Sequence, residues 1–347
     1  MHPIASRNPA HAPRPAPVAR LSVAFQSDKS WGEYAELGAL AEGYGFGTVS
    51  VYADLLFQPP LPALLAIASA TRRIRLGPAC LNPYTLHPVE IAGQIAALDA
   101  TSGGRAYLGL ARGAWLDSLG IPPRRPVTTL REAVAVVRHL LRGERAPLRG
   151  EVFRLGEEHA LQYPVARADV PVLIGAWGPR LVALAGEVAA ELKVGGAANP
   201  AIVPVMRRRL DRGAARAGRP AGATGIVLGA VTVVDQDGAR ARARARREVA
   251  RYLPVVAGLD PTVQVEPELL LRVDAAVRHG DLAGAGALVP DDLLDRFAFA
   301  GTPGQVARQT EEILAAGAAR VEFGTPHGLT AREGLRLLGE DVLPRLR

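Results

Sequence analysis

The segment RIRLGPACLNPYTLHPVEIAGQIAALDATSGGRAYLGLA (73–111) decides the fold. Residues 73–81 form a short apolar run typical of a buried strand. Residues 88–102 carry apolar side chains at helical spacing, begin with a proline and stop before a pair of glycines, as helices do. A second apolar run follows at 105–111. This order of strand, helix and strand indicates a parallel β-α-β unit.

The same alternation continues on both sides of this unit. Further strands are expected at 21–26, 48–52, 171–176, 191–196, 225–234 and 320–326. Helices are expected at 31–43, 62–71, 127–143 (with threonine caps), 179–189, 200–218 (kinked near Pro204), 303–317 and 329–342. Eight strand–helix pairs predict the α/β class and one closed (β/α)8 TIM barrel.

Two regions fall outside this alternation. Residues 1–18 are rich in proline, alanine and arginine and are expected to form a flexible tail. Residues 237–300, approximately, have a helical pattern too long for one crossover, so we expect a helical insertion before the last strand. The remaining chain, 19–347, has no linker that would divide it and is expected to be a single domain.

Composition excludes several classes of protein. The hydrophobic fraction is 48%, and no apolar run reaches the roughly 18–20 residues of a transmembrane helix. Cys80 is the only cysteine, so no intramolecular disulfide is possible and a cytoplasmic location is expected. The net charge of +7 raises the alternative of nucleic-acid binding. However, the arginines of 239–247 alternate with alanine and have no aromatic neighbours, which favours a solvated helix and no nucleic-acid partner.

Chemistry in such barrels is carried by the carboxyl ends of the strands and the loops that follow. The loop NPYTLHP (82–88) brings Asn82, Tyr84, Thr85 and His87 to this end, either as a functional loop or as a polar turn that caps the next helix. His87 is the best-placed histidine for acid/base work, and His327, after the last strand, is second.

Three more strand ends carry candidate residues. GAWGP (175–179) joins small residues to the start of a helix, which favours an anion, although simple packing explains it equally well. Asp54 follows the second strand as a hydrogen-bond acceptor or a helix cap. Arg112 and Trp115 follow the fourth strand and are placed to clamp and stack a substrate. The histidine spacing predicts no metal site, and Cys80 is expected to be structural.

These segments resemble the luciferase-like flavin and deazaflavin oxidoreductases. Within them, the chain is most similar to the branch of F420-dependent methylenetetrahydromethanopterin reductases. The likeness covers roughly residues 20–347 and is carried by 73–113, 126–144, 171–189 and 299–328. It implies the barrel fold, a homodimer, and coenzyme F420, an 8-hydroxy-5-deazaflavin, bound at the strand ends for hydride transfer.

The resemblance also implies site residues. The cofactor ring would lie over a strand bulge with a non-proline cis bond at Ala79–Cys80, and Asp54 and Asn82 would contact the ring or its polyol tail. The phosphate would bind at the turn formed by Gly175, Ala176, Trp177 and Gly178. The expected catalytic residues are His87, Asp54 and Arg112.

Some positions depart from the pattern of this branch. Leu55 replaces a histidine, the segment 25–27 lacks an acidic residue, and Glu191-Leu192-Lys193 replaces Ala-Asp-Gly. Methanopterin is therefore not the expected substrate. A small organic molecule, as in secondary metabolism, is expected, with a flavin or F420 reductase system that supplies reduced cofactor. Two alternatives stay open: an FMN-dependent monooxygenase, and a non-redox cyclase, isomerase or binding protein.

Overall fold

The computed structural model describes residues 18–346. The first half contains β1 (Val18–Phe25), α1 (Trp31–Tyr44), β2 (Phe46–Val51), α2 (Pro60–Ala70), β3 (Arg75–Pro78), α3 (Pro88–Ser102), β4 (Leu108–Ala111), η1 (Leu116–Leu119), α4 (Pro126–Leu141), β5 (Leu148–Arg149) and β6 (Arg154–Leu155). The second half begins with β7 (Val172–Gly175), α5 (Pro179–Val188), β8 (Glu191–Gly195), α6 (Ile202–Arg216) and β9 (Gly225–Val234).

The remaining elements form the insertion and the end of the barrel. They are α7 (Gly238–Ala250), α8 (Leu253–Val256), η2 (Ala257–Leu259), α9 (Pro267–Arg278), α10 (Leu282–Ala287), α11 (Asp291–Phe297), β10 (Ala298–Gly301), α12 (Pro303–Ala315), β11 (Arg320–His327), α13 (Ala331–Leu337), η3 (Leu338–Val342) and η4 (Leu343–Leu346). The expected tail lies, apart from Val18, outside the described residues.

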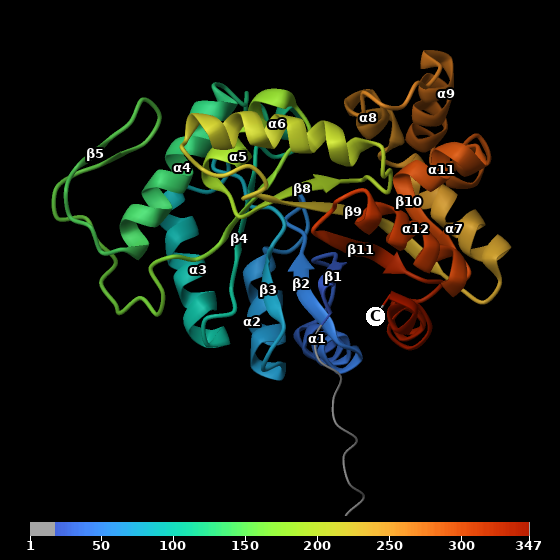
Figure 1. Cartoon of the computed structure of the whole chain (residues 1–347), viewed down its shortest axis with the longest axis horizontal. Helices are drawn as coiled ribbons and strands as arrows, with labels where there is room; N and C mark the ends of the chain where they lie inside the picture. The colour runs from blue at the N-terminus through green and yellow to red at the C-terminus, as the bar shows by residue number, and fades with distance from the viewer. Residues whose placement is uncertain (1–17, 347) are drawn as a thin grey trace, which may run out of the picture.

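The strands form the predicted barrel. Parallel pairing runs in the order β3-β2-β1-β11-β9-β8-β7-β4, with helices around the outside (Figure 1). Two isolated bridges, Leu76 to Ala106 and Leu81 to Leu110, bring β3 to β4 and nearly close the barrel. The strands of this parallel sheet therefore point their carboxyl ends to one side, which we call the mouth.

The helices begin and end for local reasons. Ser30 caps α1 and Glu33 returns the hydrogen bond, a reciprocal capping box, while Gly45 ends the helix with φ 99°. Pro88 opens α3 and Gly103 ends it with φ 67°. These signals fix where each strand resumes, and so which residues reach the mouth.

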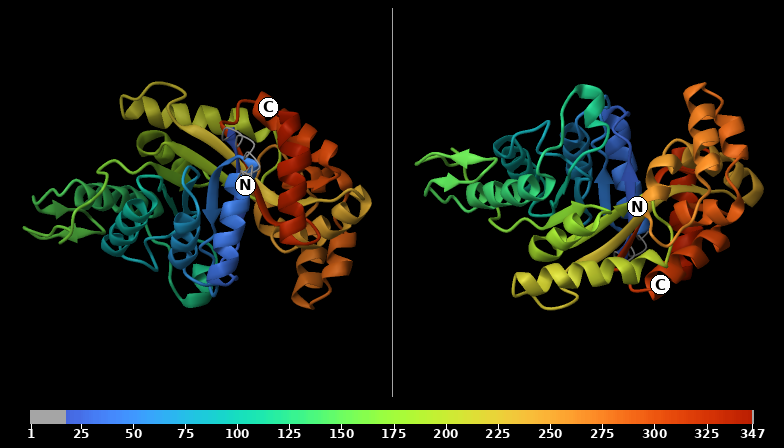
Figure 2. Two further views of the ribbon diagram at one scale, coloured as in Figure 1. Left: turned by 90° about the horizontal axis from the view of Figure 1, so that it is seen from below. Right: turned by 90° about the horizontal axis from the view of Figure 1, so that it is seen from above.

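The predicted insertion packs on one side of the barrel, opposite the projecting β5–β6 hairpin (Figure 2). Its own core includes Val249, Leu253, Leu294 and Phe297, all fully buried. The helices α7 to α11 are thus a second packed layer beside the barrel wall.

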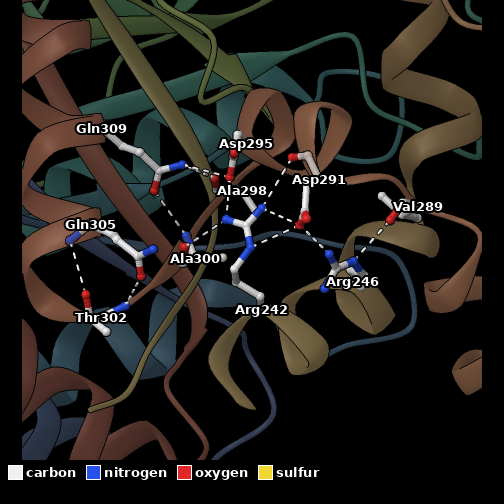
Figure 3. A network of polar contacts seen from close by, with 10 residues as sticks. All are labelled: Arg242, Arg246, Val289, Asp291, Asp295, Ala298, Ala300, Thr302, Gln305 and Gln309. Carbon is white, nitrogen blue, oxygen red and sulfur yellow. Dashed lines mark hydrogen bonds and ion pairs between the residues drawn. The ribbon is translucent and has the colours of Figure 1, made fainter. Parts of the chain in front are cut away.

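The arginine-rich helix α7 is not the fully solvated helix that its composition suggested. Its alanines at 241 and 245 are buried, and Arg242 donates to Asp291 and Asp295 of α11, at 2.6 Å each (Figure 3). Arg246 also pairs with Asp291. Because arginines four apart lie on one helix face, this part of the charge run joins two helices.

Four details of the prediction were wrong. Residues 298–301, expected within the helical insertion, form β10, which pairs with β9. The β5–β6 hairpin was missed because its strands have two residues each. Pro204 lies in the first turn of α6, where it interrupts no hydrogen bond, so the helix continues without a break. No threonine side chain caps α4, whose cap position is Arg125.

Within residues 18–346, no helix has the length and hydrophobicity needed to cross a membrane. In the same range, no group of three or more histidine, cysteine, aspartate or glutamate residues is placed to hold a metal ion.

Candidate functional site

The loop after β3 is built around Asn82, which is buried. Its Oδ1 accepts hydrogen bonds from the backbone N–H of Tyr84 (3.1 Å) and Thr85 (3.0 Å) and from the Thr85 hydroxyl. The Tyr84 hydroxyl donates to the carbonyl of Arg124 (2.7 Å), which ties this loop to the loop after β4. The side-chain oxygen Oδ1 of Asn82 is therefore already hydrogen-bonded within its own loop. The side-chain Nδ2 group has no partner among residues 18–346 and can donate to a ligand.

The peptide bond between Ala79 and Cys80 is cis, as the resemblance implied. Burial raises the pKa of the Cys80 thiol to about 12, so the side chain stays protonated and is a poor nucleophile. A Cβ atom at position 175 would lie 3.1 Å from Cys80 Sγ, so glycine at 175 lets β7 approach this bulge.

The turn after β7 leads directly into α5. Gly178 is the cap residue, with φ −68°, and no side chain caps this end of the helix. The Trp177 indole donates to the Gly195 carbonyl (2.9 Å), and Arg209 donates to the Trp177 carbonyl (2.9 Å), so the turn is held from two sides. A Cβ at position 178 would meet nothing within 4 Å. First-turn amides without a partner and open space above them suit an anion.

Asp54 and Arg112 lie at the mouth with exposed side chains. Gln26 donates to Asp54 Oδ2 (3.1 Å), which joins the ends of β1 and β2. Trp115, near Arg112, is 58% exposed and has φ 55°. Within residues 18–346, the Gln26 bond is the one hydrogen bond made by the side chains of Asp54, Arg112 and Trp115, so these side chains are available to a ligand.

His87 has a local structural role. It is the cap residue of α3, and its Nδ1 accepts from the backbone N–H of Val89 (3.2 Å). The ring also packs edge-on against Phe153, with 5.3 Å between centroids. The capping interpretation of this loop is therefore supported at His87, and its catalytic role stays a prediction.

Below the mouth, the barrel interior holds a chain of polar side chains that the sequence analysis missed. Lys193 of β8 pairs with Glu322 of β11. Glu322 accepts a hydrogen bond from the Ser50 hydroxyl (2.5 Å). The same Ser50 hydroxyl lies 2.7 Å from the Tyr107 hydroxyl, at hydrogen-bond distance. Burial raises the pKa of Glu322, but the Lys193 ammonium and the Arg320 guanidinium outweigh burial and hold this pKa below its usual value.

A second ion pair lies deeper in the barrel. Arg320 donates to both carboxylate oxygens of Glu191, at 3.0 Å each, and to the Ser22 hydroxyl (2.8 Å). Barrel interiors are usually filled by branched aliphatic side chains. A signal for this exception was present, because Lys193 is one of only two lysines and lies in a strand.

Comparison with known proteins assigns the family. A family model described as "Luciferase-like monooxygenase" matches residues 7–320. The chain belongs to the luciferase-like monooxygenase family. As a family member it has the barrel and strand-end loops that the sequence predicted.

Several named proteins are similar to this chain over most of its length. The chain is 31% identical over 338 residues to 5,10-methylenetetrahydromethanopterin reductase of Archaeoglobus fulgidus, covering 94% of this chain and 100% of the relative. It is 28% identical to F420-dependent glucose-6-phosphate dehydrogenase of Nakamurella multipartita, covering 91% and 92%. The solved structure of coenzyme F420-dependent tetrahydromethanopterin reductase from Methanopyrus kandleri matches with a TM-score of 0.87 and 28% identity, covering 94% and 99%.

Proposed function

We propose that this family member is an oxidoreductase that uses coenzyme F420 and transfers a hydride to or from a small organic substrate. The observation that carries the proposal is the grouping at the mouth of the Asn82 loop, the Asp54 carboxylate and the uncapped start of α5. Relatives named as F420-dependent align with more than nine-tenths of the chain, which supports the same cofactor.

Each part of the mouth has a task in this proposal. The first-turn amides of α5 receive the cofactor phosphate, since a helix N-terminus attracts anions. Asn82 donates through Nδ2 to the ring or polyol, and Asp54 accepts from a ring N–H. When bound, the deazaflavin supplies hydride chemistry at its C5 carbon. The protein positions the substrate and donates or accepts the proton that accompanies hydride transfer.

The family description favours a second candidate, an FMN-dependent monooxygenase. The same helix N-terminus would receive the FMN phosphate. The two cofactors differ at position 5 of the ring, which is a carbon in the deazaflavin and a nitrogen in FMN. Measuring which of the two the protein binds therefore distinguishes the two candidate functions. A non-redox member of the family would bind neither.

The test is a titration of the protein with oxidised F420 and with FMN, followed by cofactor fluorescence. We expect F420 to bind at least about tenfold more tightly, which corresponds to about 1.4 kcal/mol. Tight FMN binding with no F420 binding would overturn the proposal in favour of the monooxygenase. Binding of neither would favour a non-redox protein.

The matched variants Gly178→Asp and Gly178→Ala test the phosphate site. A Cβ atom at 178 meets no neighbour within 4 Å and the backbone has an ordinary negative φ, so both variants are expected to fold. The aspartate places negative charge beside the phosphate, and we expect at least about tenfold weaker F420 binding, or about 1.4 kcal/mol. The alanine variant should bind like the wild type. Equal affinity in both variants would remove this turn from the site.

Three further expectations are part of the proposal. The substrate is a small organic molecule, the protein is a homodimer, and a separate reductase system supplies reduced cofactor in the cytoplasm. Sedimentation of the purified protein checks the dimer.

A further inference from the structure

Tyr52 lies between the buried polar chain and the mouth. Its backbone N–H donates to the Phe25 carbonyl (2.9 Å), so the extended backbone of β2 continues through this residue. Side chains alternate along a strand, which places Tyr52, the residue directly after β2, on the same side as Ser50. Ser50 is fully buried and bonds to Glu322, whereas Asp54 is exposed. Tyr52 therefore lies between the buried Ser50 and the exposed Asp54.

The ring of Tyr52 is held in place from two directions. The Lys193 ammonium lies over its face, 4.9 Å from the ring centroid, and Glu322 fixes that ammonium. At the hydroxyl end of the ring, a Cβ at position 324 would lie 2.6 Å from the Tyr52 hydroxyl oxygen. Glycine at 324 therefore makes room for the phenol, and the orientation of the hydroxyl is set by the barrel.

The hydroxyl of Tyr52 has no hydrogen-bond partner within residues 18–346, in contrast to the hydroxyls of three buried or partly buried tyrosines. Tyr34 donates to the Gln26 carbonyl, Tyr107 bonds to Ser50, and Tyr252 donates to the Phe297 carbonyl. No residue within 18–346 hydrogen-bonds to the Tyr52 hydroxyl, and the residue is only partly buried. The Tyr52 hydroxyl is not among the buried polar atoms that lack a partner, so it is accessible and can bond to a ligand that enters from the mouth.

We propose that Tyr52 is the acid that protonates the substrate during hydride transfer, with Lys193 and Glu322 as positioning residues. This inference rests on the proposed function. It names the substrate class as an organic molecule with a polarised C=O, C=N or conjugated C=C double bond, which accepts a hydride at carbon and a proton at the other end.

The proposed step balances as follows. A hydride from C5 of the reduced deazaflavin forms a new C–H bond on the substrate, whose double bond opens toward its other atom. The Tyr52 O–H bond breaks and its proton joins that atom. The substrate gains two electrons. The bound deazaflavin would be left oxidised and would release its ring N–H proton to solvent, and the Tyr52 phenolate regains a proton from solvent.

Burial and the surrounding negative charges keep the Tyr52 phenol protonated until the transfer. Burial raises the pKa of Tyr52 well above its ordinary value, and the negative charges of Glu322 and Asp54 raise it further, so the phenol is protonated at neutral pH. Tyr252 of the insertion and Tyr107 also face it and are neutral there. Lys193 is the cation beside the ring, where it stabilises the phenolate formed in the step.

The first experiment observes Tyr52 directly, without turnover. 3-Fluorotyrosine is placed at position 52, and its ¹⁹F resonance is followed in the complex with oxidised F420 as cyclohexanone, 2-cyclohexen-1-one and 1-pyrroline are added in turn. We expect at least one probe to shift the resonance. 3-Fluorotyrosine at position 163, on an exposed loop, should show no shift. A resonance at 52 that no probe moves would overturn the proposal.

The second experiment uses Tyr52→Phe, which keeps the ring and its cation contact and removes only the hydroxyl. We expect F420 affinity within about twofold of wild type and a loss of at least about 100-fold in the oxidation of reduced F420 by the most active probe. Tyr163→Phe should keep the wild-type rate. Wild-type turnover in Tyr52→Phe would overturn the role of Tyr52 alone, whereas failure of the wild type to bind F420 would overturn the proposed function itself.

The role of Lys193 has its own readout. In the fluorotyrosine protein, Lys193→Met removes the cation beside the phenol, so the pKa at position 52, measured by ¹⁹F titration, should rise. Lys193→Arg should restore it. An unchanged pKa in Lys193→Met would overturn the positioning role and leave Lys193 as an ion-pair partner of Glu322.

Discussion

At the scale of single residues, His327 shows how burial near the mouth fixes a protonation state. Its side chain is fully buried, its Nε2 lies 3.2 Å from the Phe323 carbonyl, and its ring packs edge-on against Phe25 at 5.4 Å. Burial lowers the pKa of His327 to about 4. The imidazole is therefore neutral in the folded protein under conditions where an unfolded chain would hold a proton.

This difference predicts a pH dependence of stability. The unfolded histidine binds a proton below about pH 6.5, whereas the folded one stays neutral to about pH 4, so stability is lost as the pH falls between these values. At pH 5 the loss from this group is about 2 kcal/mol relative to pH 7. Urea unfolding measures the free energy of unfolding of wild type and of His327→Gln. The difference between the two proteins should change by about this amount from pH 7 to pH 5.

The variant His159→Gln is the control, because His159 is exposed. Its difference from wild type should be nearly the same at both pH values. A constant difference between wild type and His327→Gln from pH 7 to pH 5 would contradict the buried neutral state of His327.

Individual site residues differ in how well the sequence indicates them. The positions of the Asn82 loop and the GAWGP turn at strand ends could be predicted, because prolines and small residues mark them and they directly follow apolar runs. Tyr52 and Glu322 could not, since each is a single polar position beside apolar strand residues. Lys193 stands out as one of two lysines, but its contacts with Tyr52 and Glu322 form only when the barrel closes. For His87 the sequence left two interpretations open, because a histidine before a proline suits a helix cap as well as an acid/base site; the structure shows the cap, and the catalytic role stays a prediction.

At the scale of elements, long periodic segments were predicted well. The bounds expected for the helix at 88–102 and the strand at 225–234 are those of α3 and β9. β10 was missed because its four residues follow a helix directly and have the same alanine-rich composition as the insertion. The pairing of β10 with β9 gives the insertion an attachment to the barrel wall that no local pattern indicates.

The attachment of α7 to α11 predicts unequal effects of two arginine substitutions. Arg242 is 18% exposed and bonds to Asp291 and Asp295, whereas Arg244 is 43% exposed and pairs with Glu248 one turn along the same helix. The aspartates are themselves largely exposed, which limits the gain. We expect Arg242→Ala to lower the unfolding free energy by about 1–2 kcal/mol and Arg244→Ala by less than about 0.5 kcal/mol.

Urea unfolding measures both values, and hydrogen exchange of α11 locates the effect. Faster exchange in α11 should accompany Arg242→Ala and not Arg244→Ala. Equal losses in the two variants would mean that the contacts drawn in Figure 3 add no more stability than an ordinary surface pair.

At the scale of the whole molecule, the mouth is assembled from segments that are distant in sequence. The Asn82 loop follows β3, the GAWGP turn follows β7, and Tyr52 contacts a lysine from β8. A ligand that touches all of these binds only when the barrel is closed, so its binding energy is added to the stability of the complete fold. An unfolded or partly open chain offers no such combination of contacts.

Coenzyme F420 should therefore stabilise the protein as one unit. At a free concentration of about 100 times its dissociation constant, a ligand that binds only the folded state adds about 2.7 kcal/mol, which differential scanning calorimetry detects as a single transition moved to higher temperature. The same F420 concentration should leave Gly178→Asp nearly unshifted, because the added charge opposes the phosphate at α5, while Gly178→Ala should respond like the wild type. A shift confined to part of a split transition would instead mean that the strands contributing to the mouth do not unfold together.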